Sequence, residues 1–189
     1  MGCKVLHFQF RNGTCMIHGE RVLIRPVERG DLTLLDAWAN DVAANGEYNT
    51  FGLRPMNGME GPFSQTGLLD DRSASLVVAT LSGTQIGTMS YHQQRYGPNT
   101  GSIAYMIGLS IAASERGKGY GSEAQRLLAR YLFDTYPIAR VEASTDITNI
   151  PEQRALEKAG FVREGVLRQA QWRAGTWHDL MVYSKLRGE

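Results

Sequence analysis

Residues 116–121 read Arg116-Gly117-Lys118-Gly119-Tyr120-Gly121, between an apolar run typical of a strand and a run typical of a helix. The first turn of a helix leaves backbone N–H groups unpaired and carries the positive end of the helix dipole. Glycines there let the backbone approach a bulky anion, because no Cβ atoms stand in the way. Arg116 and Lys118 add positive charge, and the Ser122 hydroxyl adds a donor. The stretch therefore predicts a phosphate or pyrophosphate site.

Two common nucleotide motifs do not fit this stretch. A P-loop needs Ser or Thr directly after its Lys, whereas Gly119 follows Lys118. The dinucleotide fingerprint needs Gly-x-Gly-x-x-Gly after a first strand, whereas these glycines alternate and several strands are expected upstream. A glycine-rich turn that only caps a helix remains the alternative interpretation.

The sequence on both sides predicts one α+β domain. After the glycines, apolar residues recur at the helical spacing i, i+3, i+4, i+7, i+8, at Ala124, Leu127, Leu128, Tyr131 and Leu132. Helices are also expected after Asp31 and over 151–159, and strands over 21–25, 75–80, 86–93, 102–111, 140–145, 165–173 and 177–186. Asn12-Gly13, between 4–10 and 14–17, favours a small N-terminal hairpin or merely an extension.

The composition excludes several classes of protein. The chain has 189 residues, 42% hydrophobic and 21% charged, as in an ordinary soluble domain. A formal net charge of +1 gives no field to attract nucleic acid or an anionic membrane, and no apolar run approaches the roughly 20 residues of a membrane helix. Cys3 and Cys15 favour free thiols and a cytoplasmic location. No cysteine and histidine cluster has the spacing of a metal site.

Residues 45–67 break every periodicity, because glycines and prolines interrupt them repeatedly. Two interpretations stay open, a binding loop or lid and a poorly ordered connection. If the segment is a binding loop, its Gly, Met and Phe content indicates a pocket that is not strongly charged.

Three parts of the chain together resemble the GNAT superfamily of acyl-CoA N-acyltransferases. Residues 116–121 resemble its acyl-CoA signature, and Ile107-Gly108-Leu109-Ser110-Ile111 has the spacing of its preceding strand. Residues 145–161, 164–168 and 175–179 resemble the branch that acetylates N-terminal amines of ribosomal proteins, and the whole resemblance covers roughly 17–187. It implies an α+β, three-layer α/β fold, with a mixed, mostly antiparallel sheet of about seven strands and about four helices. The whole chain, 1–189, would be one such domain, with 1–16 as an N-terminal extension.

The resemblance also implies a donor site. Acetyl-CoA would be the co-substrate, without a metal, and its acyl group would pass directly to an amine without an acyl-enzyme. The residues implied in binding the pantetheine arm and the pyrophosphate are Leu109, Ile111, Arg116, Gly117, Lys118, Gly119, Tyr120, Gly121, Ser122 and Asn149.

The catalytic groups depart from the family pattern. Many relatives have a glutamate as base where this chain has Met106, and Glu152 occupies the position of a serine that acts as acid in others. The implied catalytic candidates are Glu152, Tyr105 and Asn149. Asn149-x-x-Glu152 is also a capping-box pattern, which gives Glu152 a structural alternative. Tyr91, His92 and Asp146 are further candidates, each with a structural interpretation. His178 and Asp179 do not read as a proton pair, because adjacent strand residues point to opposite faces.

The resulting hypothesis is an N-acetyltransferase that acts on a primary amine, either a protein N-terminus or a small molecule. The alternatives are an acyltransferase that uses another acyl-CoA, such as succinyl-CoA, and a CoA-sensing module without catalysis. The expected partners are acetyl-CoA and the amine, with no nucleic acid and no membrane, in a monomer or a homodimer.

Overall fold

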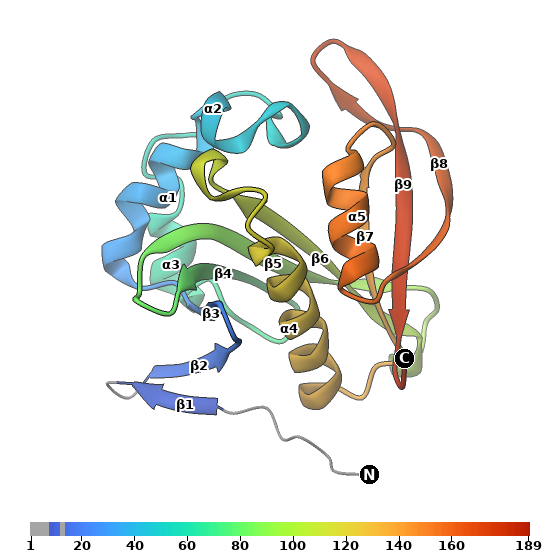
Figure 1. Ribbon diagram of the computed structural model, residues 1–189, viewed down its shortest axis with the longest axis horizontal. Helices are drawn as coiled ribbons and strands as arrows, with labels where there is room; N and C mark the ends of the chain where they lie inside the picture. The colour runs from blue at the N-terminus through green and yellow to red at the C-terminus, as the bar shows by residue number, and fades with distance from the viewer. Residues whose placement is uncertain (1–7, 12–13) are drawn as a thin grey trace.

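The computed structural model describes residues 8–11 and 14–189, which form one mixed sheet with helices on both faces (Figure 1). The strand order is β1-β2-β3-β4-β5-β6-β7-β9-β8. The strands are β1 (Phe8–Arg11), β2 (Thr14–His18), β3 (Val22–Pro26), β4 (Ser73–Thr80), β5 (Gln85–Arg95), β6 (Ile103–Ile111), β7 (Arg140–Asp146), β8 (Val162–Arg173) and β9 (Thr176–Leu186).

The pairing of β6 with β7 creates the opening on which the site depends. These two strands are parallel and pair only at Tyr105 with Val141 and at Met106 with Glu142. All the other pairs are antiparallel. Beyond Met106 the two strands continue to Ile111 and Asp146 without a shared ladder. The sheet therefore splays at the carboxyl ends of β6 and β7.

The main core lies between the sheet and two helices, α4 (Tyr120–Thr135) and α5 (Ile150–Lys158). The helical stripe expected from the sequence supplies its side of this core, since Ala124, Leu128 and Leu132 are fully buried. Leu156 of α5 is equally buried. This layer fixes the starts of α4 and α5 on one face of the splayed strands (Figure 1).

A second core covers the opposite face of β3 and β4. Leu23, Val77 and Ala79 face α1 (Leu32–Ala39) there, and Phe63 of α3 (Glu60–Thr66) packs against the same cluster. The strands alternate between the two cores, as expected for a sheet covered on both faces. None of the helices in the described ranges is long and apolar enough to cross a membrane.

The expected fold class is confirmed. The described residues give nine strands in the sheet, and β3–β9 account for the seven that were expected. The other two, β1 and β2, pair as the N-terminal hairpin, whose turn at 12–13 lies outside the described residues. Residues 45–67 contain short elements: the end of α2 (Val42–Asn45), the 3-10 turn η2 (Glu47–Asn49) and α3. The remaining 3-10 turns are η1 (Arg29–Asp31), η3 (Thr100–Ser102) and η4 (Ala113–Glu115).

Candidate functional site

The glycine turn at the start of α4 has the backbone geometry that only glycine adopts easily. Gly117 has φ +75°, and Gly119, the N-cap of α4, has φ +83°. A Cβ atom on Gly121 would lie 3.1 Å from Leu109 Cδ2. The turn can therefore run close to β6 and leave its N–H groups open to an anion.

The turn between β2 and β3 makes hydrogen bonds to the glycine turn and to the first turn of α4. Glu123, in the first turn of α4, accepts hydrogen bonds from the backbone N–H groups of Glu20 and Arg21, the latter at 3.0 Å. The Arg21 guanidinium donates to the Lys118 carbonyl at 3.3 Å. Because Glu123 is buried and held at two points, the first turn of α4 has a fixed position against the sheet.

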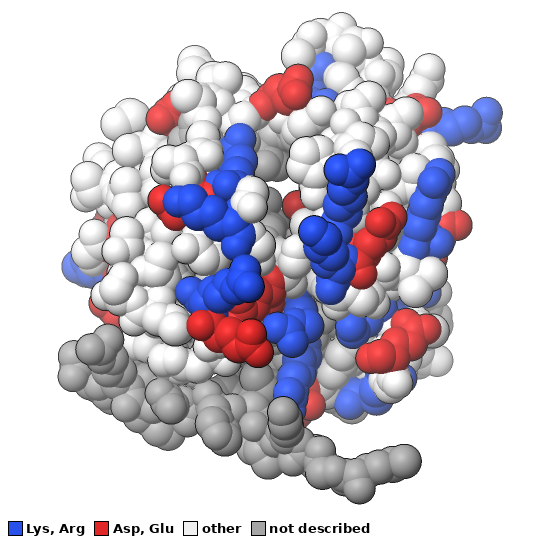
Figure 2. All heavy atoms as spheres, viewed as in Figure 1, with Lys and Arg blue, Asp and Glu red and all other residues white. Residues whose placement is uncertain are grey.

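A cleft of about 410 Å³ opens between the start of α4 and one side of α5, and we call it the α4–α5 cleft. Figure 2 shows Lys and Arg side chains gathered along both sides of a hollow at this place. The end of β6 and residues 45–49 complete its walls. The expected binding residues that line it are Leu109, Ile111, Arg116, Gly117, Gly119, Tyr120, Gly121, Ser122 and Asn149.

Arg116 is held at the edge of the cleft by the backbone. Its Nε donates to the Ile111 carbonyl at 2.8 Å. Its guanidinium also lies against Gly46, where an added Cβ atom would be 3.1 Å from Nη1. The side chain thus bridges the end of β6 and the segment 45–49, with its charge at the wall of the cleft.

Asn149 and Glu152 lie at the start of α5, in the same wall. The Asn149 side chain caps the helix, because its Oδ1 accepts from the Glu152 N–H at 3.4 Å. The Glu152 carboxylate does not bond back to Asn149 N–H, which donates to the Asp146 carbonyl instead. It accepts a hydrogen bond from Gln125 Nε2. Only half of the expected capping box forms, and the Glu152 carboxylate bonds to Gln125 instead of to the helix cap.

Burial dominates the electrostatics of Glu152. Desolvation raises the pKa of this carboxyl group to about 7, although the hydrogen bond from Gln125 opposes the shift. A carboxyl group with a pKa near neutral pH can hold or release a proton under ordinary conditions, which is what a general acid or base requires.

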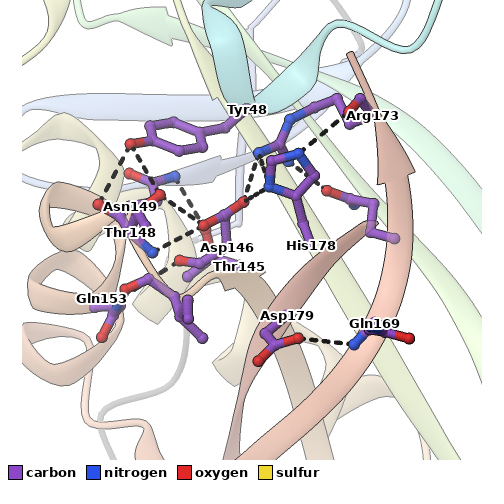
Figure 3. A network of polar contacts seen from close by, with 12 residues as sticks. Tyr48, Thr145, Asp146, Thr148, Asn149, Gln153, Gln169, Arg173, His178 and Asp179 are labelled. Atoms are coloured by element: carbon purple, nitrogen blue, oxygen red, sulfur yellow. Dashed lines mark hydrogen bonds and ion pairs between the residues drawn. The ribbon is translucent and has the colours of Figure 1, made fainter. Parts of the chain in front are cut away.

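A buried charge network closes the end of β7 (Figure 3). The Asp146 carboxylate forms an ion pair with Arg173 of β8 and lies 2.9 Å from His178 Nδ1 of β9. Burial by itself would raise the pKa of Asp146, but hydrogen bonds from Thr148 and the Arg173 ion pair outweigh it and hold the pKa at about 2. The carboxylate is therefore ionised and fully paired.

Tyr48 connects this network with the α4–α5 cleft (Figure 3). Its hydroxyl donates to the Thr148 carbonyl at 3.3 Å, and the Arg173 guanidinium lies 5.4 Å from its ring centroid. Tyr48 is thus held by Thr148, which follows β7, and by Arg173 of β8. These two contacts keep residues 45–49 in the wall of the cleft.

Residues 21–162 match the model of the acetyltransferase (GNAT) domain. The chain belongs to the GNAT acetyltransferase family. This confirms the resemblance and the enzyme class expected from the sequence, an acyl-CoA-dependent N-acetyltransferase.

Named relatives agree with the family. YjcK of Bacillus subtilis (strain 168), a probable N-acetyltransferase, is 38% identical over 80 residues, which are 42% of this chain and 44% of YjcK. The match therefore spans less than half of that relative's length. Spermidine N-acetyltransferase from Vibrio cholerae, in complex with CoA and spermine, aligns with a TM-score of 0.77 at 19% identity, covering 89% of this chain and 97% of that one. The ribosomal-protein-S5-alanine acetyltransferase from Vibrio fischeri aligns with a TM-score of 0.72 at 19% identity, covering 92% and 97%. These two alignments show a shared fold.

Two of the expected site residues of this GNAT chain lie elsewhere. The Lys118 ammonium pairs with Glu115 at 3.0 Å, is half exposed and does not line the α4–α5 cleft. Tyr105 is buried in a tyrosine cluster, 4.9 Å from the Tyr136 ring centroid, and its hydroxyl donates to the Asp71 carbonyl. That geometry gives Tyr105 a packing role, because its hydroxyl is already committed to a turn outside the cleft.

Sequence reasoning missed the basic face of α5. Arg154 and Lys158 line the cleft opposite the glycine turn, with Ala155 between them. Their i, i+4 spacing places them on one face of the helix, and this was the available signal. It could not be used from sequence, since nothing local shows which face of α5 turns toward α4. Tyr48 was missed for a similar reason: its partner Thr148 is 100 residues away along the chain.

Proposed function

We propose that this protein transfers the acetyl group of acetyl-CoA to a primary amine, by direct attack within a ternary complex. The α4–α5 cleft is the observation that carries the proposal, because it joins a glycine turn at a helix start to the end of β6, where β6 has parted from β7. The family supplies the reaction class, and the lining of the cleft supports a site for the donor there.

The walls of the cleft suit the parts of acetyl-CoA. The N–H groups of the glycine turn, with Ser122, would hold the pyrophosphate. Arg116, Arg154 and Lys158 supply positive charge from both sides, which a local anionic group needs in a chain of net charge +1. Beyond Met106 the edge of β6 is not paired with β7, so the backbone at Leu109 would bind the amides of the pantetheine arm, with Asn149 in the lining of the same cleft.

The transfer needs few protein groups. The neutral amine nitrogen forms a C–N bond to the acetyl carbon, the C–S bond breaks, and CoA leaves as its thiol. A proton passes from the amine to solvent, and the sulfur takes one up. An α-amine has a pKa near 8, so a useful fraction is neutral at physiological pH. Holding both substrates together supplies much of the acceleration.

We assign Glu152 as the group that protonates the leaving sulfur. Its carboxyl group lines the cleft and has its pKa raised to about 7 by burial. Glu152→Gln should lower kcat by about 100-fold, the usual contribution of a general acid, and leave the Kd for acetyl-CoA unchanged. With saturating substrates, wild-type kcat should fall as the pH rises above about 7, because the acid form is lost. If the variant keeps the same falling limb, Glu152 is not that acid.

Calorimetric titration tests the donor site. Acetyl-CoA, dephospho-CoA and ATP are titrated into the wild type, Gly119→Glu and Gly175→Glu. Gly175 is the control, because its φ of +82° matches the +83° of Gly119 but it lies in the β8–β9 turn, outside the cleft. We expect micromolar acetyl-CoA binding that only the substitution at Gly119 abolishes.

Two results would change the proposal. Absence of acetyl-CoA binding, or tighter binding of ATP, would reject an acyl-CoA site. Acetyl-CoA binding without turnover across a broad panel of amines would favour the CoA-sensing alternative. Comparison with succinyl-CoA under the same conditions separates the acyl donors.

A further inference from the structure

A second cavity, of about 200 Å³, lies under α1 on the other face of β6, and we call it the Trp38 cavity. Thr88 of β5 and Ser110 of β6 are cross-strand partners and form its floor. Trp38 of α1 and Met59 close it from above. The cavity is too small for a large ligand and suits one side chain or a small metabolite.

The Trp38 cavity adjoins the α4–α5 cleft. Asn45, Asn49 and Ser110 line both spaces. Leu109 and Ile111 line only the cleft and Ala112 lines only the cavity, whereas Ser110 lies at the boundary and lines both. The end of β6 therefore lies between a molecule in the cavity and the α4–α5 cleft, where the acetyl group is proposed to lie.

One wall of the cavity is apolar, and the rest of its lining is polar. Leu35, Trp38 and Met59 form the apolar wall, and among the described residues Arg54 is the one charged residue in the lining. The Arg54 backbone is fixed by Asn40, whose side chain accepts from its N–H at 2.8 Å and donates to its carbonyl at 3.0 Å. Within residues 8–11 and 14–189, the Arg54 guanidinium forms no ion pair.

This lining does not suit a polycation. Among the residues that the structure describes, no acidic one lines the Trp38 cavity. Asp146, at the end of β7, already forms an ion pair with the buried Arg173. An amine that carries a carboxylate would instead meet Arg54, and an uncharged side chain would meet Trp38 and Met59.

We propose that the Trp38 cavity holds the acceptor, and that the acceptor is a small amine with an apolar side chain and a carboxylate, as in an apolar amino acid. The inference rests on the proposed acetyl transfer and names its acceptor class. Arg54 binds the carboxylate, the apolar wall takes the side chain, and the α-amine reaches the thioester past Ser110. The amine nitrogen forms the new C–N bond, the C–S bond breaks, and the proton leaves to solvent.

The acceptor class is tested by initial rates of CoA thiol release from acetyl-CoA. L-leucine, L-methionine and L-phenylalanine are compared with their amides and with spermidine. We expect kcat/KM for the best amino acid to exceed that for its amide by about tenfold, the effect of one charge-assisted contact. Spermidine should be the poorest acceptor. The amides mimic a peptide N-terminus, so equal or faster reaction of the amides would overturn the assignment and favour a protein substrate.

Matched variants test the residues. Arg54→Gln should abolish the preference for the amino acid over its amide, whereas Arg95→Gln, at the exposed end of β5, should keep it. Ala39→Met fills the cavity and should raise the acceptor KM at least about tenfold. Ala37→Met, on the exposed side of the same helix, is the control. An Arg54→Gln variant that keeps the preference overturns the role of Arg54, and an unchanged KM in Ala39→Met overturns the cavity.

Calorimetry with acetyl-CoA distinguishes failure of the proposed acetyl transfer from failure of the proposed acceptor class. If acetyl-CoA binds and spermidine is acetylated while the amino acids are not, the proposed function stands and this acceptor class is rejected. If acetyl-CoA binds and none of the carboxylate-bearing amines reacts, the acceptor class is rejected as well. If acetyl-CoA does not bind, the proposed function fails and the acceptor site fails with it.

Discussion

Glu152 lies in the wall of the α4–α5 cleft, where burial raises the pKa of its carboxyl group from 4.5 to about 7. Folding therefore favours its protonated form. The stability that this proton contributes is present below pH 4.5 and is lost as the pH rises through about 7. The protein thus keeps a carboxyl group that costs stability at neutral pH, which is a common feature of functional residues.

Glu152→Gln should remove this pH dependence. The free energy of unfolding of the wild type, relative to the variant, should fall by about 3 kcal/mol between pH 4.5 and 8, because each pKa unit corresponds to about 1.4 kcal/mol. Urea denaturation at several pH values measures the difference. Parallel curves for the two proteins would show that the carboxyl group is not buried as described.

Asp146 is the opposite case, because its pKa is lowered to about 2. Asp146→Asn leaves Arg173, which is 5% exposed, without its ion-pair partner and should destabilise the protein by about 3 kcal/mol. Asp134→Asn is the control, since Asp134 pairs with Arg130 at 3.5 Å on the surface and should lose less than about 1 kcal/mol. Equal losses in urea denaturation would contradict the buried network.

The helix α5 presents different chemistry along its length. Its start carries the Asn149 cap and Glu152, and its later turns carry Arg154 and Lys158 toward the cleft. The last turn of a helix has the negative end of the dipole, which stabilises a cation such as Lys158 there. One helix therefore supplies the group proposed for proton transfer and the charge proposed for phosphate binding.

Lys158→Gln should weaken acetyl-CoA binding several-fold, and the loss should shrink as salt is added. Lys118→Gln should have the smaller effect, although Lys118 stands inside the glycine turn, because its ammonium pairs with Glu115 and Lys118 does not line the cleft. Calorimetry at two salt concentrations gives both comparisons. A larger loss in Lys118→Gln would show that this side chain reaches the ligand.

In the whole molecule, two cores share a single sheet. Leu128 belongs to the core under α4, and Leu32 belongs to the core under α1. Because strands β3 and β4 contribute side chains to both cores, neither layer can unfold without exposing the other face of the same strands. The described domain should therefore unfold as one cooperative unit.

Leu128→Ala and Leu32→Ala test this cooperativity. Each should lower the free energy of unfolding by about 2–5 kcal/mol and shift one common transition. Tryptophan fluorescence, to which Trp38 contributes beside the α1 core, is compared with far-UV circular dichroism. Two separate transitions in either variant would show that the layers are independent.

Much of the fold and half of the candidate site follow from local sequence. The positive φ of Gly117 and Gly119, the buried stripe of α4 and the Asn149 cap each depend on residues within a few positions, so the pattern predicts them. The family motif lies in the same segment. The Gly, Met and Phe content of residues 45–67 also predicts a pocket that is not strongly charged, and the Trp38 cavity that we propose for the acceptor has Arg54 and Met59 of this segment in its lining.

Only the tertiary structure decided which side chains face one another across the cleft. It turned Lys118 outward and Arg154 with Lys158 inward, and it placed Tyr48 against Thr148 across 100 residues. It paired Asp146 with Arg173 and buried Glu152 enough to move its pKa. These facts depend on the splay of β6 from β7 and on the rotation of α5 over the sheet. Contacts between distant segments set both of these, and no local pattern encodes them.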